Sequence, residues 1–305
     1  MTRLTRIGPL QRSRLYLAIA LITPAALIML AVTLFPLLQS LYMSLVKWNL
    51  ARPQTIGRFV GLDNYASTLG DPRFWDSALI TVEFAVLAVA LEIGLGVLIA
   101  LMLNRDFRGR SFIRLLALLP WAIPPVVNGI IWKWILNPRY GALNGLLLQL
   151  GLIRSPDDYI VWLGTPTLAL LMVVLADVWK ETPFIVLLIL AALQTVPPGI
   201  HEAARVDGAG PVRILFRITL PLIAPTLFVA IALRTIWALK SFDLIYTLTA
   251  GGPSNGTNVI GYYTYLQSFV SLDLARGAAI AYLLTFAIMG LVLVYQRLLY
   301  REVRY

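Results

Sequence analysis

Long apolar runs dominate the order of hydrophobic and polar residues along the 305-residue chain. A helix needs about 20 largely apolar residues to cross the roughly 30 Å hydrocarbon core of a bilayer. Segments that meet this requirement cover residues 15–46, 77–103, 112–136, 161–194, 218–246 and 277–296. The pattern therefore predicts an all-α membrane protein, with six transmembrane helices in a single transmembrane domain over residues 1–305.

The first segment needs a separate argument, because four arginines precede it, as in the basic start of a signal peptide. The uncharged stretch over residues 15–46 far exceeds the roughly 7 to 15 residues of a cleavable apolar core. We therefore expect this segment to be a retained helix.

The charge distribution predicts the orientation. An even number of spans places both termini on one side of the membrane. If that side is the cytoplasm, it receives fourteen basic residues, including Arg3, Arg6 and Arg304, against seven on the other side. This excess follows the positive-inside rule and predicts cytoplasmic termini. It also accounts for much of the net charge of +10, so nucleic-acid binding is not needed to explain that charge.

The composition excludes several kinds of site. The chain has no cysteine and one histidine, His201, so disulfides and thiolate zinc sites are excluded and a transition-metal site is not expected. A phosphate-binding loop needs a lysine directly after a glycine, and none of Lys47, Lys133, Lys180 and Lys240 has one. We recognise no catalytic residues, so any ATP hydrolysis must occur in another chain.

The segment at residues 197–211 predicts a short helix between the fourth and fifth spans. Pro197 and Pro198 end the preceding span, and a proline is acceptable in the first turn of a new helix. We expect the new helix to start at Ile200 and to end near Gly208. The result is a compact cytoplasmic knob with a face of small residues.

The spacing in and after this segment is specific. Glu202, Ala203 and Ala204 are followed by Gly208, then by Ile218 and by Leu220 and Pro221. This spacing resembles the coupling-loop signature of permeases of bacterial ATP-binding-cassette (ABC) importers. Residues 59–65, 120–124 and 249–253 are similar to the sugar-importing branch, as in the larger permease subunit of maltose, glycerol-phosphate and trehalose systems.

The resemblance runs from about Phe59 to the C-terminus and implies a type I ABC importer permease fold in a bacterial inner membrane. It further implies a coupling helix that sits in a groove of a separate ATPase dimer, which uses ATP and Mg, while this chain binds no cofactor. The expected coupling residues are Glu202, Ala203, Ala204, Arg205, Asp207 and Gly208. The other implied partners are a second homologous permease and an extracytoplasmic sugar-binding protein.

Polar residues within the spans indicate where a substrate binds, since ionisable groups in a membrane usually face a cavity or a partner. The resemblance places pore contacts at residues 179–183 and 237–241. The candidate substrate-binding residues are Asn128, Lys180, Glu181, Phe184, Trp237, Lys240 and Ser241. Aromatic rings can stack on sugars while polar groups bond the hydroxyls.

Structural roles compete with these assignments. Lys180 with Asp177 or Glu181, and Lys240 with Asp243, have the spacing of ion pairs within one helix. Trp132, Trp134 and Trp162 suit interface anchors, and Glu83 and Glu92 are expected to face partner helices.

We therefore expect a permease subunit of an ATP-driven importer for a disaccharide such as trehalose or maltose. A permease for another small solute, such as glycerol phosphate, phosphate or a peptide, is a close alternative. An ion-coupled secondary transporter would use Asp177, Glu181 and Asp243 as relays and often shows an internal repeat, which we do not find. A membrane-embedded enzyme is a further alternative.

Overall fold

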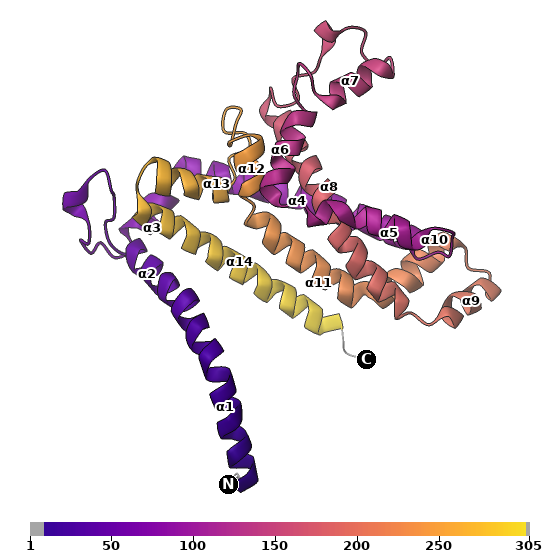
Figure 1. Cartoon of the computed structure of the whole chain (residues 1–305), viewed down its shortest axis with the longest axis horizontal. Helices are drawn as coiled ribbons and strands as arrows, with labels where there is room; N and C mark the ends of the chain where they lie inside the picture. The colour runs from indigo at the N-terminus through magenta and orange to yellow at the C-terminus, as the bar shows by residue number, and fades with distance from the viewer. Residues whose placement is uncertain (1–8, 303–305) are drawn as a thin grey trace. The chain divides into compact units, whose positions relative to one another are not determined.

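The computed structural model describes residues 9–302, which are largely helical (Figure 1). Within this range there is no β-strand, and two isolated β-bridges join Val46 to Phe59 and Asn49 to Asp273. Arg3, Arg6 and Arg304 lie outside the described residues. The described chain forms two compact units, one of residues up to 68 with 267–282, the other of residues 69–266 with those from 283 onward.

The first unit consists mainly of one long N-terminal helical run. The run comprises α1 (Pro9–Met29), the π-helical turn η1 (Leu30–Leu34) and α2 (Phe35–Ser44). The unit continues with η2 (Pro53–Thr55) and most of α3 (Asp63–Leu69). The run meets the first part of α14 (Leu274–Glu302), where the Tyr282 hydroxyl donates to the Leu37 carbonyl at 2.6 Å. Large apolar side chains from Tyr16 to Leu38 are exposed within the chain, as suits a helix that faces lipid or another subunit.

The second unit contains the remaining helices. They are α4 (Pro72–Leu103), α5 (Arg110–Leu118), η3 (Leu119–Ala122), α6 (Pro125–Ile135), α7 (Ala142–Gln149), η4 (Pro156–Asp158), α8 (Pro166–Gln194), α9 (Pro198–Val206), α10 (Pro211–Ile214), η5 (Leu215–Thr219), α11 (Leu220–Leu239), α12 (Asp243–Leu248), α13 (Ile260–Tyr265) and most of α14, while η6 (Leu266–Val270) belongs to the first unit apart from Leu266. In Figure 1, α9 and α10 lie at the opposite end of α8 and α11 from α6 and α12.

The core of the second unit is the packing of α4 against α8. Small residues bring the two backbones close, as is usual between membrane helices. A Cβ atom on Gly96 of α4 would lie within 2.8 Å of the Ile185 side chain on α8. Phe84 and Ala88 of α4 and Val173 of α8 are fully buried in the same core. This packing holds fixed the helix faces that carry the polar residues described below.

Four helices are long and apolar enough to cross a membrane: Tyr16–Ser44, Pro72–Leu103, Pro211–Leu239 and Leu274–Arg297. Two bent pairs raise the number to six if each pair is one span. They are Arg110–Ala122 with Pro125–Ile135, bent by 97°, and Pro166–Gln194 with Gly199–Val206, bent by 75°. These numbers of candidate spans are based on the length and composition of helices within residues 9–302.

Two expected spans differ from single continuous helices. The third, expected over residues 112–136, breaks at Ile123, because Pro124 cannot extend the 3₁₀ turn η3 as an α-helix. The fifth, expected over 218–246, ends as a helix at Leu239, and a new helix begins at Asp243. Both breaks lie beside the polar residues of the candidate site.

Candidate functional site

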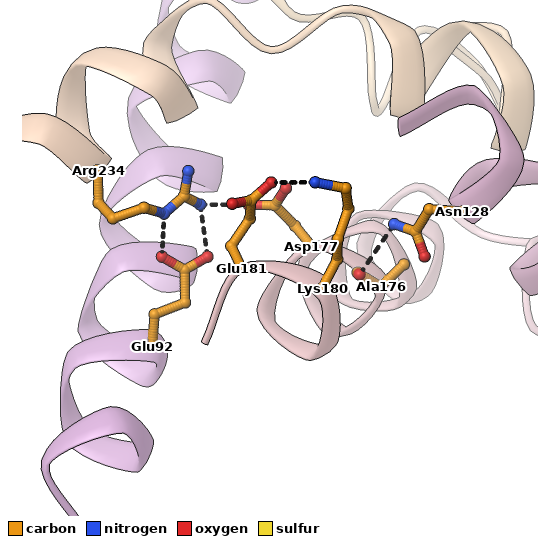
Figure 2. Close-up of polar contacts among 7 residues, drawn as sticks. All are labelled: Glu92, Asn128, Ala176, Asp177, Lys180, Glu181 and Arg234. Carbon is orange, nitrogen blue, oxygen red and sulfur yellow. Dashed lines mark hydrogen bonds and ion pairs between the residues drawn. The ribbon is translucent and has the colours of Figure 1, made fainter. Parts of the chain in front are cut away.

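A buried ion network joins three helices of the second unit (Figure 2). The Arg234 guanidinium of α11 donates to both carboxylate oxygens of Glu92 on α4, each at 2.5 Å. The same guanidinium donates to Asp177 on α8 at 2.8 Å. The Arg234 side chain is 2% exposed and that of Glu92 is 0% exposed, so the charges are shielded from solvent within the chain and satisfied by each other.

The network joins residues of three helices, whereas the sequence spacing indicated ion pairs within single helices. Glu92 was expected to face a partner helix, and its contact with α11 confirms this. Arg234 was not among the candidate site residues, although an arginine in an apolar span needs a carboxylate partner and this requirement could have singled it out. Glu83, in contrast, is exposed within the chain.

A second ion pair lies next to this network on α8. The Lys180 ammonium is 2.6 Å from a carboxylate oxygen of Glu181, and both side chains are largely buried. This confirms one of the two expected partners of Lys180, while the other, Asp177, bonds Arg234. Figure 2 shows the side chains of Arg234, Asp177, Glu181 and Lys180 gathered at one place.

The expected pair of Lys240 with Asp243 is absent from the interactions of residues 9–302. The physical reason is the end of α11 at Leu239, with Lys240 as its C-terminal cap and Asp243 in the first turn of α12. The two residues do not share a helix, so the spacing that places side chains on one helical face does not apply.

A polar cavity of about 190 Å³ brings the candidate residues together. Six of the seven line it: Asn128 from α6, Lys180 and Glu181 from α8, Trp237 from α11, and Lys240 and Ser241 from the break that follows. The other lining residues include Asp177, Arg234 and Asp243. Charged groups, an amide, a hydroxyl and an indole thus converge on one space, where they can donate to and accept from a polar ligand.

Asn128 lines this cavity and has a buried side-chain oxygen that accepts no hydrogen bond from the described residues. The residue is fully buried, and its amide nitrogen donates to the Ala176 carbonyl of α8 at 3.1 Å. Its Oδ1 atom has no hydrogen-bond partner among the described residues. Next to it, Gly129 packs so closely on α12 that a Cβ atom there would lie 1.8 Å from Thr247 Oγ1. This contact fixes the position of Asn128.

Phe184 is the seventh candidate and does not line the cavity. Its ring centroid lies 4.8 Å from that of Trp237 and 5.9 Å from that of Trp121. Phe184 therefore packs against a cavity residue and supports the position of the indole.

A second cavity of about 800 Å³ lies among α4, α11 and the C-terminal part of α14. Its lining is almost entirely apolar, with Leu, Ile, Val and Ala side chains and few polar atoms such as those of Thr235 and Tyr295. These two hydroxyls bond each other at 3.1 Å. An apolar cavity suits hydrocarbon groups. The smaller polar cavity is therefore the candidate site for a hydroxylated ligand.

The helix α9 forms within the segment expected as a coupling knob. It begins at Pro198, two residues before the expected start at Ile200. Gly208 has a φ of +77°, which glycine adopts without strain, and the Ala209 amide donates to the Ala204 carbonyl at 2.9 Å to close the helix. Ala204 is buried, while the remaining expected coupling residues, Glu202, Ala203, Arg205, Asp207 and Gly208, are exposed.

His201 ties α9 to the base of α11. Its Nε2 atom lies 3.1 Å from the Thr219 hydroxyl, the last residue of η5. Thr219 is buried, so this hydrogen bond is partly protected from solvent. The single histidine thus has a structural partner, and no group of three or more His, Asp or Glu side chains among residues 9–302 has the arrangement of a metal site.

The tryptophans outside the cavity differ in their surroundings. Trp134 is exposed, the Trp162 indole donates to the Asn144 side-chain oxygen at 3.1 Å, and Trp132 packs edge-on against Trp179. Trp162 is therefore held by a hydrogen bond within the protein. The role of the three residues as interface anchors stays a prediction.

Residues 92–305 match the family model described as binding-protein-dependent transport system inner membrane component. The chain is 40% identical over 276 residues to the trehalose/maltose transport system permease protein MalF of Thermococcus litoralis, covering 90% of each chain. It is 36% identical over 285 residues to the sulfoquinovosyl glycerol transport system permease protein SmoG of Agrobacterium fabrum, covering 93% of this chain and 90% of that one.

The fold is similar to that of a solved bacterial ABC transporter involved in the import of the acidic polysaccharide alginate. The TM-score is 0.82 and the sequence identity 23%, over 96% of this chain and 98% of the solved chain. The likeness concerns the fold alone.

Proposed function

The chain belongs to the family of binding-protein-dependent transport system inner membrane components, and from this premise we propose that it forms half of the translocation pore of an ATP-driven disaccharide importer. It is a permease subunit of a sugar ABC importer with the type I permease fold, and it is not an enzyme. In the proposal, a separate ATPase dimer hydrolyses ATP with Mg, a second homologous permease completes the pore, and an extracytoplasmic binding protein delivers the sugar.

The observation that carries the proposal is the polar cavity between α6, α8 and α11. Carboxylates, ammonium groups, the Asn128 amide and the Ser241 hydroxyl surround it. These groups can accept from and donate to sugar hydroxyls, while the Trp237 indole offers a flat apolar face for a sugar ring. A disaccharide of the trehalose or maltose kind is supported by this chemistry and by the relative named for trehalose and maltose.

Coupling to ATP hydrolysis is proposed to occur at α9. Glu202, Ala203, Arg205 and Asp207 are exposed there and available to a partner. Because α9 follows α8 and is tied to α11 through His201 and Thr219, a movement of α9 reaches α8 and α11, two of the helices that line the cavity. This arrangement supports alternating access, in which ATPase closure rocks the permease pair around the site.

The proposed location is a bacterial inner membrane with both termini in the cytoplasm. The excess of arginines on that side supports the orientation. It places α9 on the cytoplasmic side as well, where an ATPase can reach it.

The test is reconstitution of the chain with its co-purifying permease and ATPase in liposomes. We expect uptake of radiolabelled trehalose or maltose that requires ATP and the binding protein. The matched control is an ATPase subunit whose ATP-binding lysine is replaced, which should abolish uptake. Uptake driven by an ion gradient without ATP would contradict the proposal and favour a secondary transporter.

A further inference from the structure

We infer that the polar cavity selects uncharged sugars and discriminates against anionic ones, because its own charges are already balanced. The inference rests on the proposed function and names the substrate class of the same site. It concerns the lining of the cavity in this chain, whatever the binding protein delivers.

The lining carries equal numbers of acidic and basic groups. Its carboxylates are those of Asp177, Glu181 and Asp243, and its cations are those of Lys180, Arg234 and Lys240. Glu92 adds a further carboxylate directly behind Arg234. The formal charge of the lining is therefore zero, and it is −1 once Glu92 is included.

The two buried cations are also committed to partners. The Arg234 guanidinium donates through Nε and Nη2 to Glu92 and through Nη2 to Asp177, so two carboxylates already balance its charge. The Lys180 ammonium is held 2.6 Å from Glu181. A phosphate or sulfonate group that approaches either cation also approaches the carboxylate paired with it, so the attraction to the cation is offset by repulsion from the carboxylate.

Lys240 does not provide a separate anion site. It is exposed, and it shares the cavity lining with the Asp243 carboxylate, two residues after Ser241. A point charge on a flexible stem with a carboxylate in the same lining gives an incoming anion little net attraction.

The remaining groups suit neutral hydroxyls. The Ser241 hydroxyl lines the cavity and can donate to or accept from a neutral hydroxyl. The ammonium of Lys180 has three donors, of which Glu181 accepts one. A hydroxylated ligand can therefore bond the lining without breaking either ion pair.

The experiment measures binding to the full complex of both permeases and the ATPase in nanodiscs, without the binding protein. The probes are radiolabelled trehalose and trehalose 6-phosphate, which differ by one anionic group. We expect the wild-type complex to bind trehalose at least about tenfold more tightly, because the phosphate group loses its hydration in a lining of zero formal charge. Equal or tighter binding of the phosphorylated sugar would overturn the inference.

Variants give a second readout. In Glu181→Gln, Lys180 loses its partner, so trehalose 6-phosphate should gain at least about fivefold in affinity relative to trehalose. Asp243→Asn changes an exposed lining carboxylate and should shift the ratio in the same direction. The matched control is Asp106→Asn, which removes the exposed partner of Arg110 outside the cavity and should leave the ratio unchanged. An unchanged ratio in both lining variants would also overturn the inference.

The reconstituted complex can show separately whether the selectivity for uncharged sugars fails or whether the proposed importer function fails. ATP-dependent import of a phosphorylated or sulfonated sugar by the reconstituted complex would keep the importer and refute the selectivity. Absence of ATP-dependent uptake of any sugar would instead refute the importer.

Discussion

The guanidinium of Arg234 on α11 and the carboxylate of Glu92 on α4 form a two-point hydrogen bond, each arm 2.5 Å long, with both side chains buried. The residues are separated by 142 positions in the chain. Asp177 binds the same guanidinium from α8. One side chain thus fixes the relative rotation of α4, α8 and α11, of which α8 and α11 line the polar cavity.

The first prediction concerns this network. Arg234→Met leaves the Glu92 carboxylate buried without a counter-ion, which should destabilise the protein by about 3 to 5 kcal/mol. Adding Glu92→Met removes the stranded charge and should restore part of the stability. The measurement is thermal unfolding of the detergent-solubilised chain. Arg110→Met, at an exposed ion pair, serves as control and should cost at most about 1 kcal/mol. If the double variant is less stable than Arg234→Met alone, the network does not hold the charges as described.

The second prediction concerns the tie between α9 and α11. Thr219→Val keeps the volume of the side chain but removes the hydroxyl that contacts His201 at 3.1 Å. The lost hydrogen bond is worth about 1 kcal/mol, so we expect a roughly fivefold loss of sugar-stimulated ATP hydrolysis in the reconstituted complex. Thr219→Ser should retain the activity.

Thr195→Val is the control for this pair, because among residues 9–302 the Thr195 hydroxyl bonds only the Ala192 carbonyl, which belongs to the preceding helix α8. It should leave the stimulation unchanged. Equal losses in Thr219→Val and Thr195→Val would show that the contact of His201 has no part in coupling.

The third prediction concerns the contact of α6 with α12. In Gly129→Ala, the new Cβ atom would lie 1.8 Å from Thr247 Oγ1, so the helices must move apart. Overpacking of this kind costs about 1 to 3 kcal/mol, and the displacement of neighbouring Asn128 should also weaken sugar binding. Gly145→Ala on α7 meets no atom within 4 Å and should be neutral or stabilising by up to about 1 kcal/mol. Melting temperatures and sugar binding of the two variants check this; equal behaviour would contradict it.

The sequence predicted the helices of this protein well, because a long apolar run has few other stable conformations in a bilayer. The break of the third span at Pro124 was also readable in principle, since proline cannot continue the preceding turn. The pairing of Arg234 with Glu92 was not, because it depends on how α4 and α11 rotate against each other in the folded state. Spacing along one helix carries no information about that rotation.

Most of the residues around the polar cavity could be selected from the sequence, because polar residues are rare in apolar spans. Polar residues such as Asn128, Lys180 and Lys240 stand out in apolar spans, and such residues gather at a cavity or a partner. Phe184 carries no such signal, since an apolar ring packs against a protein side chain as readily as against a ligand. Likewise, the separation of Lys240 from Asp243 depends on where α11 ends, which the expected span of 218–246 did not show.

The last prediction tests the sugar-stacking role of Trp237. Its indole lines the cavity and is backed by the Phe184 ring at 4.8 Å. An aromatic contact contributes about 0.5 to 1.5 kcal/mol beyond area burial, so Trp237→Ala should weaken trehalose binding to the full complex by up to about tenfold. Trp237→Phe should retain most of the affinity, because the flat face remains.

Phe184→Leu separates support from direct contact in the same assay. If Phe184 acts through the indole, its substitution should weaken binding in the wild-type background and have little further effect in Trp237→Ala, since residues in contact are not additive. Trp134→Ala, at an exposed tryptophan outside the cavity, is the control and should leave binding unchanged. Equal affinities for Trp237→Ala and Trp134→Ala would mean that the indole holds no sugar, and the ligand would then be bound by the polar groups of the cavity alone.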